Sequence, residues 1–237
     1  LTIVFLFSFG LANAGEVIYP VLPSDGNFVI DQTDTLKPKQ IKEINNIALK
    51  LWTEKKIPIV TVMVTSLRSM GAGNQSIERY TQDLFNHWQL GLKKRNYGVI
   101  LLVSIQDRKA RIEFGNDWDH RYDSDARDIM TNYIVPRFKQ GEYSVGVIDG
   151  VEALNKLVRG LKLPEIKQPW WTMPLGIGLV ILVIGTIVSL FRSGRSGWGW
   201  ALIIGIGLLL WFVMRNAGRG GLSGGGSGGG GGATGSW

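Results

Sequence analysis

Residues 98–115 read GVILLVSIQDRKARIEFG and carry the strongest signal for the fold of this chain. The first half, Gly98 to Ile105, is an almost unbroken apolar run of the length and composition of a buried strand. Asp107-Arg108 then forms a tight turn. Beyond the turn, apolar side chains alternate with Arg111 and Glu113, which predicts a second strand with one face in water. The stretch therefore predicts a strand hairpin at the centre of a sheet.

The residues before this hairpin alternate between strand and helix patterns. Residues 28–30 predict a short strand, and Pro58 to Ser66 (PIVTVMVTS) is β-branched and predicts a second buried strand. Between and after them, apolar residues recur at three- and four-residue steps in two stretches. The first begins at Pro38 and the second is capped by Ser76, so both are expected to be helices.

Two further helices are expected after the hairpin, over about 123–139 and 143–161, with Pro136 bending or splitting the first. The order is then β-α-β-α-β-β-α-α. This order predicts an α/β fold, a three-layer α/β/α domain with a mixed sheet of about four strands.

Charge is distributed unevenly along the 237 residues. All 19 acidic residues lie between Glu16 and Glu165, whereas four of the 26 basic residues lie beyond residue 167. The remaining 22 bases and 19 acids leave the expected exported domain, residues 15–167, only +3 in net charge. The basic excess therefore lies beside apolar segments and indicates membrane topology, and we expect no nucleic-acid binding. The absence of cysteine excludes disulfides, a thiol nucleophile and a cysteine zinc site.

Apolar segments lie near both ends of the chain. Residues 1–14 resemble a signal peptide that ends in Ala12-Asn13-Ala14, with an N-terminal membrane anchor as the alternative. Residues 168–215 are expected to form a two-helix membrane anchor, with spans at 173–191 and 198–214 and Arg192 and Arg195 on the cytoplasmic side. A buried helical hairpin is the alternative. The expected location is the bacterial inner membrane, with the soluble domain on the periplasmic side.

The last residues, 216–237, are mostly Gly and Ser and are expected to be a flexible, disordered tail, because such a chain buries too little surface to offset its backbone entropy. Trp237 is an unexpected aromatic end for such a segment. A docking tag and an inherited accident both remain open as explanations.

Aspartates in two loops are the candidate site residues. The predicted metal ligands are Asp31, Asp34, Asp117, Asp119 and Asp123, which would bind Ca²⁺ or Mg²⁺ if the two loops converge. The alternative is that Asp123 caps a helix and that the charges of Asp125 and Asp128 interact favourably with the positive N-terminal end of that helix. The other aspartates would then be solvated. Arg108, Arg111 and Arg121 are candidates to hold a phosphate. His87 and His120 are expected to be structural, and no catalytic residue can be assigned.

Several blocks together resemble the TPM domain family. They are FVIDQTDTLK (28–37), IVTVMVTSLR (59–68), FNHWQLGL (85–92), residues 98–115, Tyr122-Asp123 and IVPRFKQGEYSVGVI (134–148). The apolar pair of segments and the Gly-rich tail are similar to the bacterial membrane-anchored members, which are related to thylakoid-lumen photosystem-repair proteins.

The resemblance implies an exported α/β domain, and some family members are acid phosphatases or bind calcium. Many members have Gly-Tyr-Gly-Leu-Glu where this chain reads Gly115-Asn116-Asp117-Trp118-Asp119. We therefore expect a binding or assembly module for other membrane or envelope proteins, with calcium as a candidate ligand. The alternative is a divalent-metal-dependent phosphatase at the envelope.

Overall fold

The structure is a computed structural model that describes residues 16–24, 26–92, 95–160, 172–193, 200, 203–208, 211 and 228–237. The chain divides into two units. Residues 1–23, 27–160 and 222–237 form the first, and residues 24–26 and 161–221 form the second. The expected signal peptide, the linker at 161–171, Lys93-Lys94 and most of the second apolar segment lie outside the described residues.

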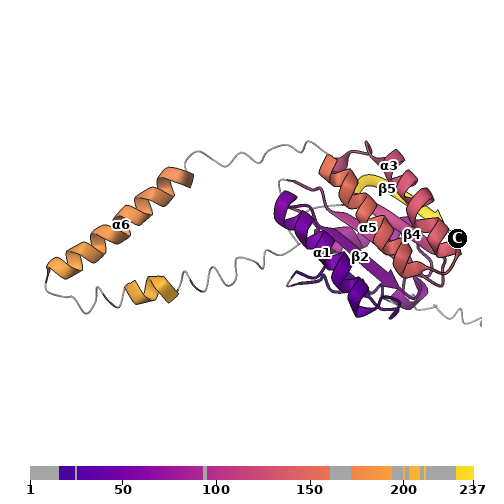
Figure 1. The fold of residues 1–237 in the computed structure, drawn as a ribbon, viewed down its shortest axis with the longest axis horizontal. Helices are drawn as coiled ribbons and strands as arrows, with labels where there is room; N and C mark the ends of the chain where they lie inside the picture. Colours follow the sequence, from indigo (N-terminus) through magenta and orange to yellow (C-terminus); the bar gives the residue numbers. More distant parts are fainter. Residues whose placement is uncertain are drawn as a thin grey trace, which may run out of the picture. The chain divides into compact units, whose positions relative to one another are not determined.

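A five-stranded mixed sheet forms the centre of the first unit (Figure 1). Its strands, in spatial as well as chain order, are β1 (Val29–Asp31), β2 (Ile59–Val64), β3 (Val99–Ser104), β4 (Lys109–Gly115) and β5 (Gly228–Ser236). The first three are parallel, β4 runs antiparallel to β3, and β5 runs antiparallel to β4. The predicted mixed sheet and the hairpin at 98–115 are confirmed.

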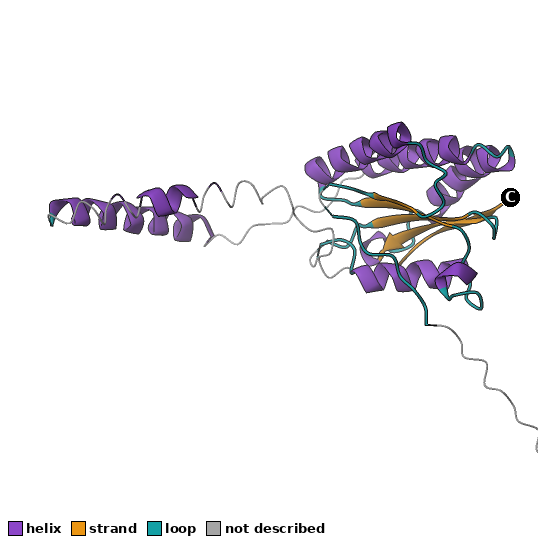
Figure 2. Ribbon diagram, turned by 90° about the horizontal axis from the view of Figure 1, so that it is seen from below, coloured by secondary structure: helices purple, strands orange, loops and turns teal. Residues whose placement is uncertain are grey.

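Helices cover both faces of this sheet, which confirms the three layers (Figure 2). The α-helices are α1 (Pro38–Lys55), α2 (Ile77–Trp88), α3 (Asp123–Ile129), α4 (Val135–Lys139) and α5 (Tyr143–Gly160), with short 3₁₀ turns η1 (Arg68–Met70) and η2 (Asn116–Trp118). On one face, α2 packs in a core cluster with Val60 and Val62 of β2 and Ile100 and Leu102 of β3. The alternating side chains of strands buried on both faces require such cover on each side.

Capping residues and prolines set where these helices begin and where one of them breaks. Ser76 accepts a hydrogen bond from the Arg79 N–H at 3.2 Å and caps α2, and Pro38 begins α1. Pro136 lacks the N–H that a continuous helix needs, and the chain accommodates it with the π-helical turn η3 (Met130–Ile134) between α3 and α4. The prediction that Pro136 splits this helix is confirmed.

The fifth strand comes from the segment that was expected to be a disordered tail. That prediction is wrong for residues 228–237, because β5 pairs with β4 from Lys109 opposite Ser236 to Gly115 opposite Gly228. The ladder of main-chain hydrogen bonds depends on no side chain, so a glycine run can form it when a partner strand is already in place. Composition alone gave no indication of that partner.

The second unit contains α6 (Thr172–Arg192), which matches the position of the first apolar segment. Its side chains Ile181, Leu182, Ile184 and Val188 are each more than half exposed. Within the described part of the chain, no helix combines the length and hydropathy that crossing a membrane requires.

We expect Gly146→Ala to destabilise the domain by about 1–3 kcal/mol, because the added methyl group would lie 2.7 Å from Cε1 of Phe138 and 2.9 Å from Cβ of Arg137. Gly160→Ala is the matched control in the same helix, since nothing lies within 4 Å of its added carbon. Urea denaturation followed by circular dichroism measures both. Equal unfolding free energies for the two variants would contradict the tight contact between α4 and α5.

Candidate peptide-binding site

Polar and aromatic contacts surround residues 228–237. Strand β5 lies along the outer edge of β4 and packs against α2, α3 and η2. We call this surface the tail groove. Its side chains are Glu78, Asn86, Arg111, Glu113, Asp123, Phe138 and Tyr143.

Side chains and main chain of the tail groove bind the peptide groups of the glycine run. The Gly232 N–H donates to Asp123 Oδ1 at 2.7 Å, and the Gly228 N–H donates to Asn86 Oδ1 at 2.8 Å. The His120 N–H donates to the Gly230 carbonyl oxygen at 2.7 Å. Gly230 lies where the pairing with β4 shifts register, so its carbonyl oxygen takes a partner outside the ladder, and Gly228 and Gly232 flank this shift.

A buried ion pair lies beneath the middle of the tail. Glu113 is only 2% exposed and accepts hydrogen bonds from Arg111 Nε at 3.0 Å and Nη2 at 2.7 Å. Burial raises the pKa of the Glu113 carboxyl, while Arg111 and a hydrogen bond from the Gly229 backbone oppose that rise. The predicted wet face of this strand is therefore wrong at Glu113, because α2 and β5 cover it.

Thr234 joins the tail to α2. Its hydroxyl donates to Glu78 Oε1 at 2.6 Å and accepts a longer hydrogen bond from Arg111 at 3.4 Å. Thr234 lies directly opposite Arg111 in the ladder. The contact fixes which residues of the tail face α2.

Trp237 ends the tail in an aromatic contact. Its ring packs against Phe138 and Tyr143, with centroid distances of 4.6 and 5.9 Å, and its indole N–H donates to the Tyr143 hydroxyl at 3.4 Å. Its backbone N–H donates to the Arg108 carbonyl oxygen at 3.3 Å and extends the ladder by one residue. Aromatic contacts of this kind give both apolar burial and orientation.

The glycines of the tail are required by space as well as by backbone conformation. A methyl group on Gly230 would overlap the Gly115 carbonyl oxygen, and one on Gly232 would overlap the Ile112 carbonyl oxygen. One on Gly231 would overlap Asp123 Oδ1. Gly231 and Gly232 also have φ angles of +110° and +142°, which L side chains rarely adopt. The shape of the tail groove therefore requires glycine at these three positions.

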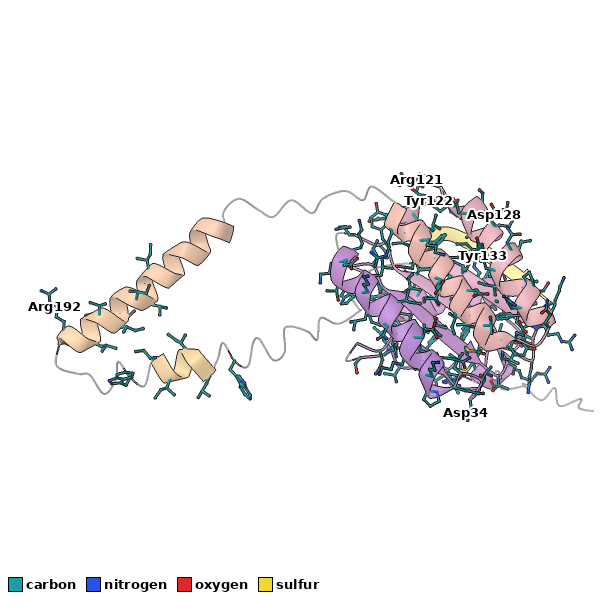
Figure 3. All side chains as sticks on the ribbon, in the orientation of Figure 1. Asp34, Arg121, Tyr122, Asp128, Tyr133 and Arg192 are labelled. Carbon is teal, nitrogen blue, oxygen red and sulfur yellow. The ribbon has the colours of Figure 1, made fainter. Side chains whose placement is uncertain are left out.

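The predicted convergence of the two aspartate loops does not occur. Asp31 ends β1 at the carboxyl end of the parallel strands, whereas the 117–123 loop follows β4, which runs the other way. Figure 3 shows Asp34 at one end of the domain and Arg121 and Tyr122 at the other. Asp31 instead organises its own loop, accepting hydrogen bonds from the N–H groups of Thr33 and Leu36 at 2.8 and 2.7 Å.

The remaining predicted ligands also have local partners. Asp117 Oδ2 accepts from the Asn96 N–H at 2.8 Å, and Asp119 follows η2 in a left-handed conformation. Asp123 begins α3 and holds both Gly232 and His120, whose Nδ1 lies 3.0 Å from Asp123 Oδ2. Across the described residues, no three acidic or histidine side chains form a group able to hold a metal ion.

The three arginines proposed for phosphate do not meet either. Arg111 is paired with Glu113, Arg121 donates to the Asp117 carbonyl oxygen at 3.3 Å, and Arg108 lies in the β3–β4 turn. His87 stacks on Tyr19 with a centroid distance of 4.9 Å, a packing role. The sequence did not identify Glu78 and Tyr143 as site residues. The one signal of a surface that binds the tail was Trp237, an aromatic residue without an obvious partner.

The fold and the tail groove define an α/β domain that closes the edge of its own sheet with a distant strand. The family model of the TPM domain matches residues 29–157, more than half of the chain. The chain belongs to the TPM domain family.

Two solved structures are similar to the domain. The N-terminal domain of a protein from P. gingivalis, determined by solution NMR, has a TM-score of 0.51 and 24% identity, over 57% of this chain and 83% of that one. The N-terminal domain of the cg2496 protein from Corynebacterium glutamicum has a TM-score of 0.45 and 15% identity, over 66% and 99%. The first likeness supports the fold alone. A comparison with curated proteins gives no match.

We expect Asp123→Asn to loosen the tail, since the charged acceptor for the Gly232 N–H is lost. The asparagine oxygen still accepts, but a neutral hydrogen bond is weaker than a charged one by about 1 kcal/mol, so amide exchange in residues 228–236 should accelerate roughly fivefold. Hydrogen–deuterium exchange with mass spectrometry measures this directly. The exposed Asp128 of the same helix supplies the control, Asp128→Asn, which should leave tail exchange unchanged. Unchanged exchange in Asp123→Asn would contradict the assigned contact.

Glu113 predicts a pH dependence of stability. Because its pKa is raised in the folded domain, its contribution is fully present below its ordinary value of 4.5 and is lost as pH rises through the raised value. Glu113→Gln lacks this loss, so its unfolding free energy should improve relative to wild type between pH 4 and pH 7. Urea denaturation at both pH values tests this. A difference that is flat or of opposite sign would show that Arg111 outweighs burial.

Proposed function

We propose that this chain is a membrane-anchored, exported TPM-domain protein that serves as a binding or assembly module for other membrane or envelope proteins. The observation that carries the proposal is the pairing of β5 with β4. It brings the chain back to the domain after the apolar region at 172–214. A segment that leaves a domain and returns to it must cross a bilayer an even number of times.

The even number of crossings agrees with two spans and puts the tail on the domain's side of the membrane. The exposed apolar side chains of α6 support insertion, since large apolar surfaces of this kind are covered in a native environment. Arg192 would then lie in the connection on the cytoplasmic side, as the positive-inside tendency favours. The signal peptide at 1–14 would export the domain.

The binding role is supported by what the tail groove does chemically. Asn86, Glu113 and Asp123 present oxygen acceptors to the N–H groups of an extended strand, and Phe138 and Tyr143 hold an aromatic end. These are contacts of polypeptide recognition. Calcium or magnesium binding and phosphatase activity stay predictions, and the described contacts of their candidate residues favour neither.

The absence of native cysteine makes the topology directly testable. Single substitutions Glu142→Cys in the domain, Ser193→Cys after α6 and Ser236→Cys in the tail, all at exposed positions, are treated with a membrane-impermeant maleimide in intact spheroplasts. The domain and tail positions should label at once, and Ser193→Cys only after lysis. Labelling of Ser193→Cys in intact cells, or recovery of the chain in the soluble fraction, would refute the anchored topology.

A further inference from the structure

We infer that the tail groove is a binding site for a segment of another polypeptide, a glycine-rich strand followed by a tryptophan. The chain's own residues 228–237 are then the intramolecular occupant of that site. This inference rests on the proposed role as a binding module and names its ligand class. The sequence GGGGGATGSW, seen bound in the groove, defines the chemistry of the ligand.

The first argument is that the outer edge of β4 can pair with an added strand. Without β5, the outer side of β4 would expose a row of unpaired peptide groups, which is a template for strand addition. Beside that row, Asp123 and Asn86 carry acceptors that are satisfied by tail N–H groups. The groove therefore offers a complete hydrogen-bonding surface to any chain of matching shape, whether or not it belongs to the same molecule.

The second argument is selectivity, which the groove imposes in two ways. Side chains are excluded where Gly230 and Gly232 approach the carbonyl oxygens of Gly115 and Ile112, so the ligand must have glycine there. Gly235 is similarly confined, because an added carbon would lie 2.5 Å from Cγ of Met130. Ordinary edge pairing would accept most side chains. This site accepts a narrow pattern.

The third argument is the anchor at the end of the ligand. The ladder continues to the N–H of Trp237, and the Trp237 ring packs against Phe138 and Tyr143. Trp237 is half-buried, and a tryptophan packed at a fixed position is the type of residue that dominates binding energy in peptide interfaces. Trp237 also sets the register, because it is the one aromatic side chain in GGGGGATGSW.

The chain's own residues 228–237 compete with any such ligand for the tail groove. A segment that belongs to the same molecule is present at a high effective concentration, so a free peptide reaches the groove only when the tail is weakened or outnumbered. Gly230→Ala with Gly232→Ala weakens the tail without altering any side chain of the groove. The double variant therefore opens the site in the full chain.

The test uses the full chain in detergent and a fluorescein-labelled GGGGGATGSW peptide, followed by fluorescence anisotropy. The opened double variant should bind the peptide at least about tenfold more tightly than wild type, whose tail competes. A peptide with alanine at its third and fifth glycines, and one with alanine for the final tryptophan, should each bind at least about tenfold more weakly. Adding Tyr143→Ala to the opened variant should weaken binding of the original peptide.

Circular dichroism confirms that each variant is folded. Should the double variant fail to fold, Trp237→Ala takes its place, because it keeps every glycine and removes only the anchor. A folded, opened chain that does not bind the peptide, or that binds the altered peptides equally well, overturns the inference. Such a result leaves the labelling pattern of the anchored topology untouched, so the two proposals fail separately.

Discussion

Closure of the β4 edge by β5 is the interaction on which the rest of this structure depends. An edge strand presents unpaired N–H and C=O groups, and this domain satisfies them with a segment from the far end of its own chain. The same closure buries Glu113 against Arg111 and gives Asp123 a main-chain donor. Because closure requires the chain to return, it also constrains the path of the apolar region between α5 and β5.

The direction of the strands governs which polar side chains can act together. Three parallel strands would have gathered their following loops at one end of the sheet, the usual place for a ligand. The hairpin reverses β4, so the loop with Asp117 and Asp123 lies at the end opposite Asp31. The carboxylates that suggested a cation site are thus divided, and one of them serves the strand at the edge.

The glycine run shows how the same composition can support opposite structural conclusions. Fixing each residue costs about 1–2 kcal/mol of backbone entropy, and glycine costs more than most, which argues for disorder. The groove offsets that cost with a ladder, several acceptors and the burial of Trp237 against Phe138. A balance between large opposing terms also means that docking is open to displacement by an equivalent strand.

Local patterns were enough for the central fold. The alternation at 109–115, the β-branched run at 59–64, the cap at Ser76 and the break at Pro136 act over a few residues, so the sequence alone determined the first four strands, most helices and the family. Only the tertiary structure decided the role of the tail and the fate of the aspartates. Asp123 and its partner Gly232 are 109 residues apart, and no periodicity encodes a pairing across such a distance.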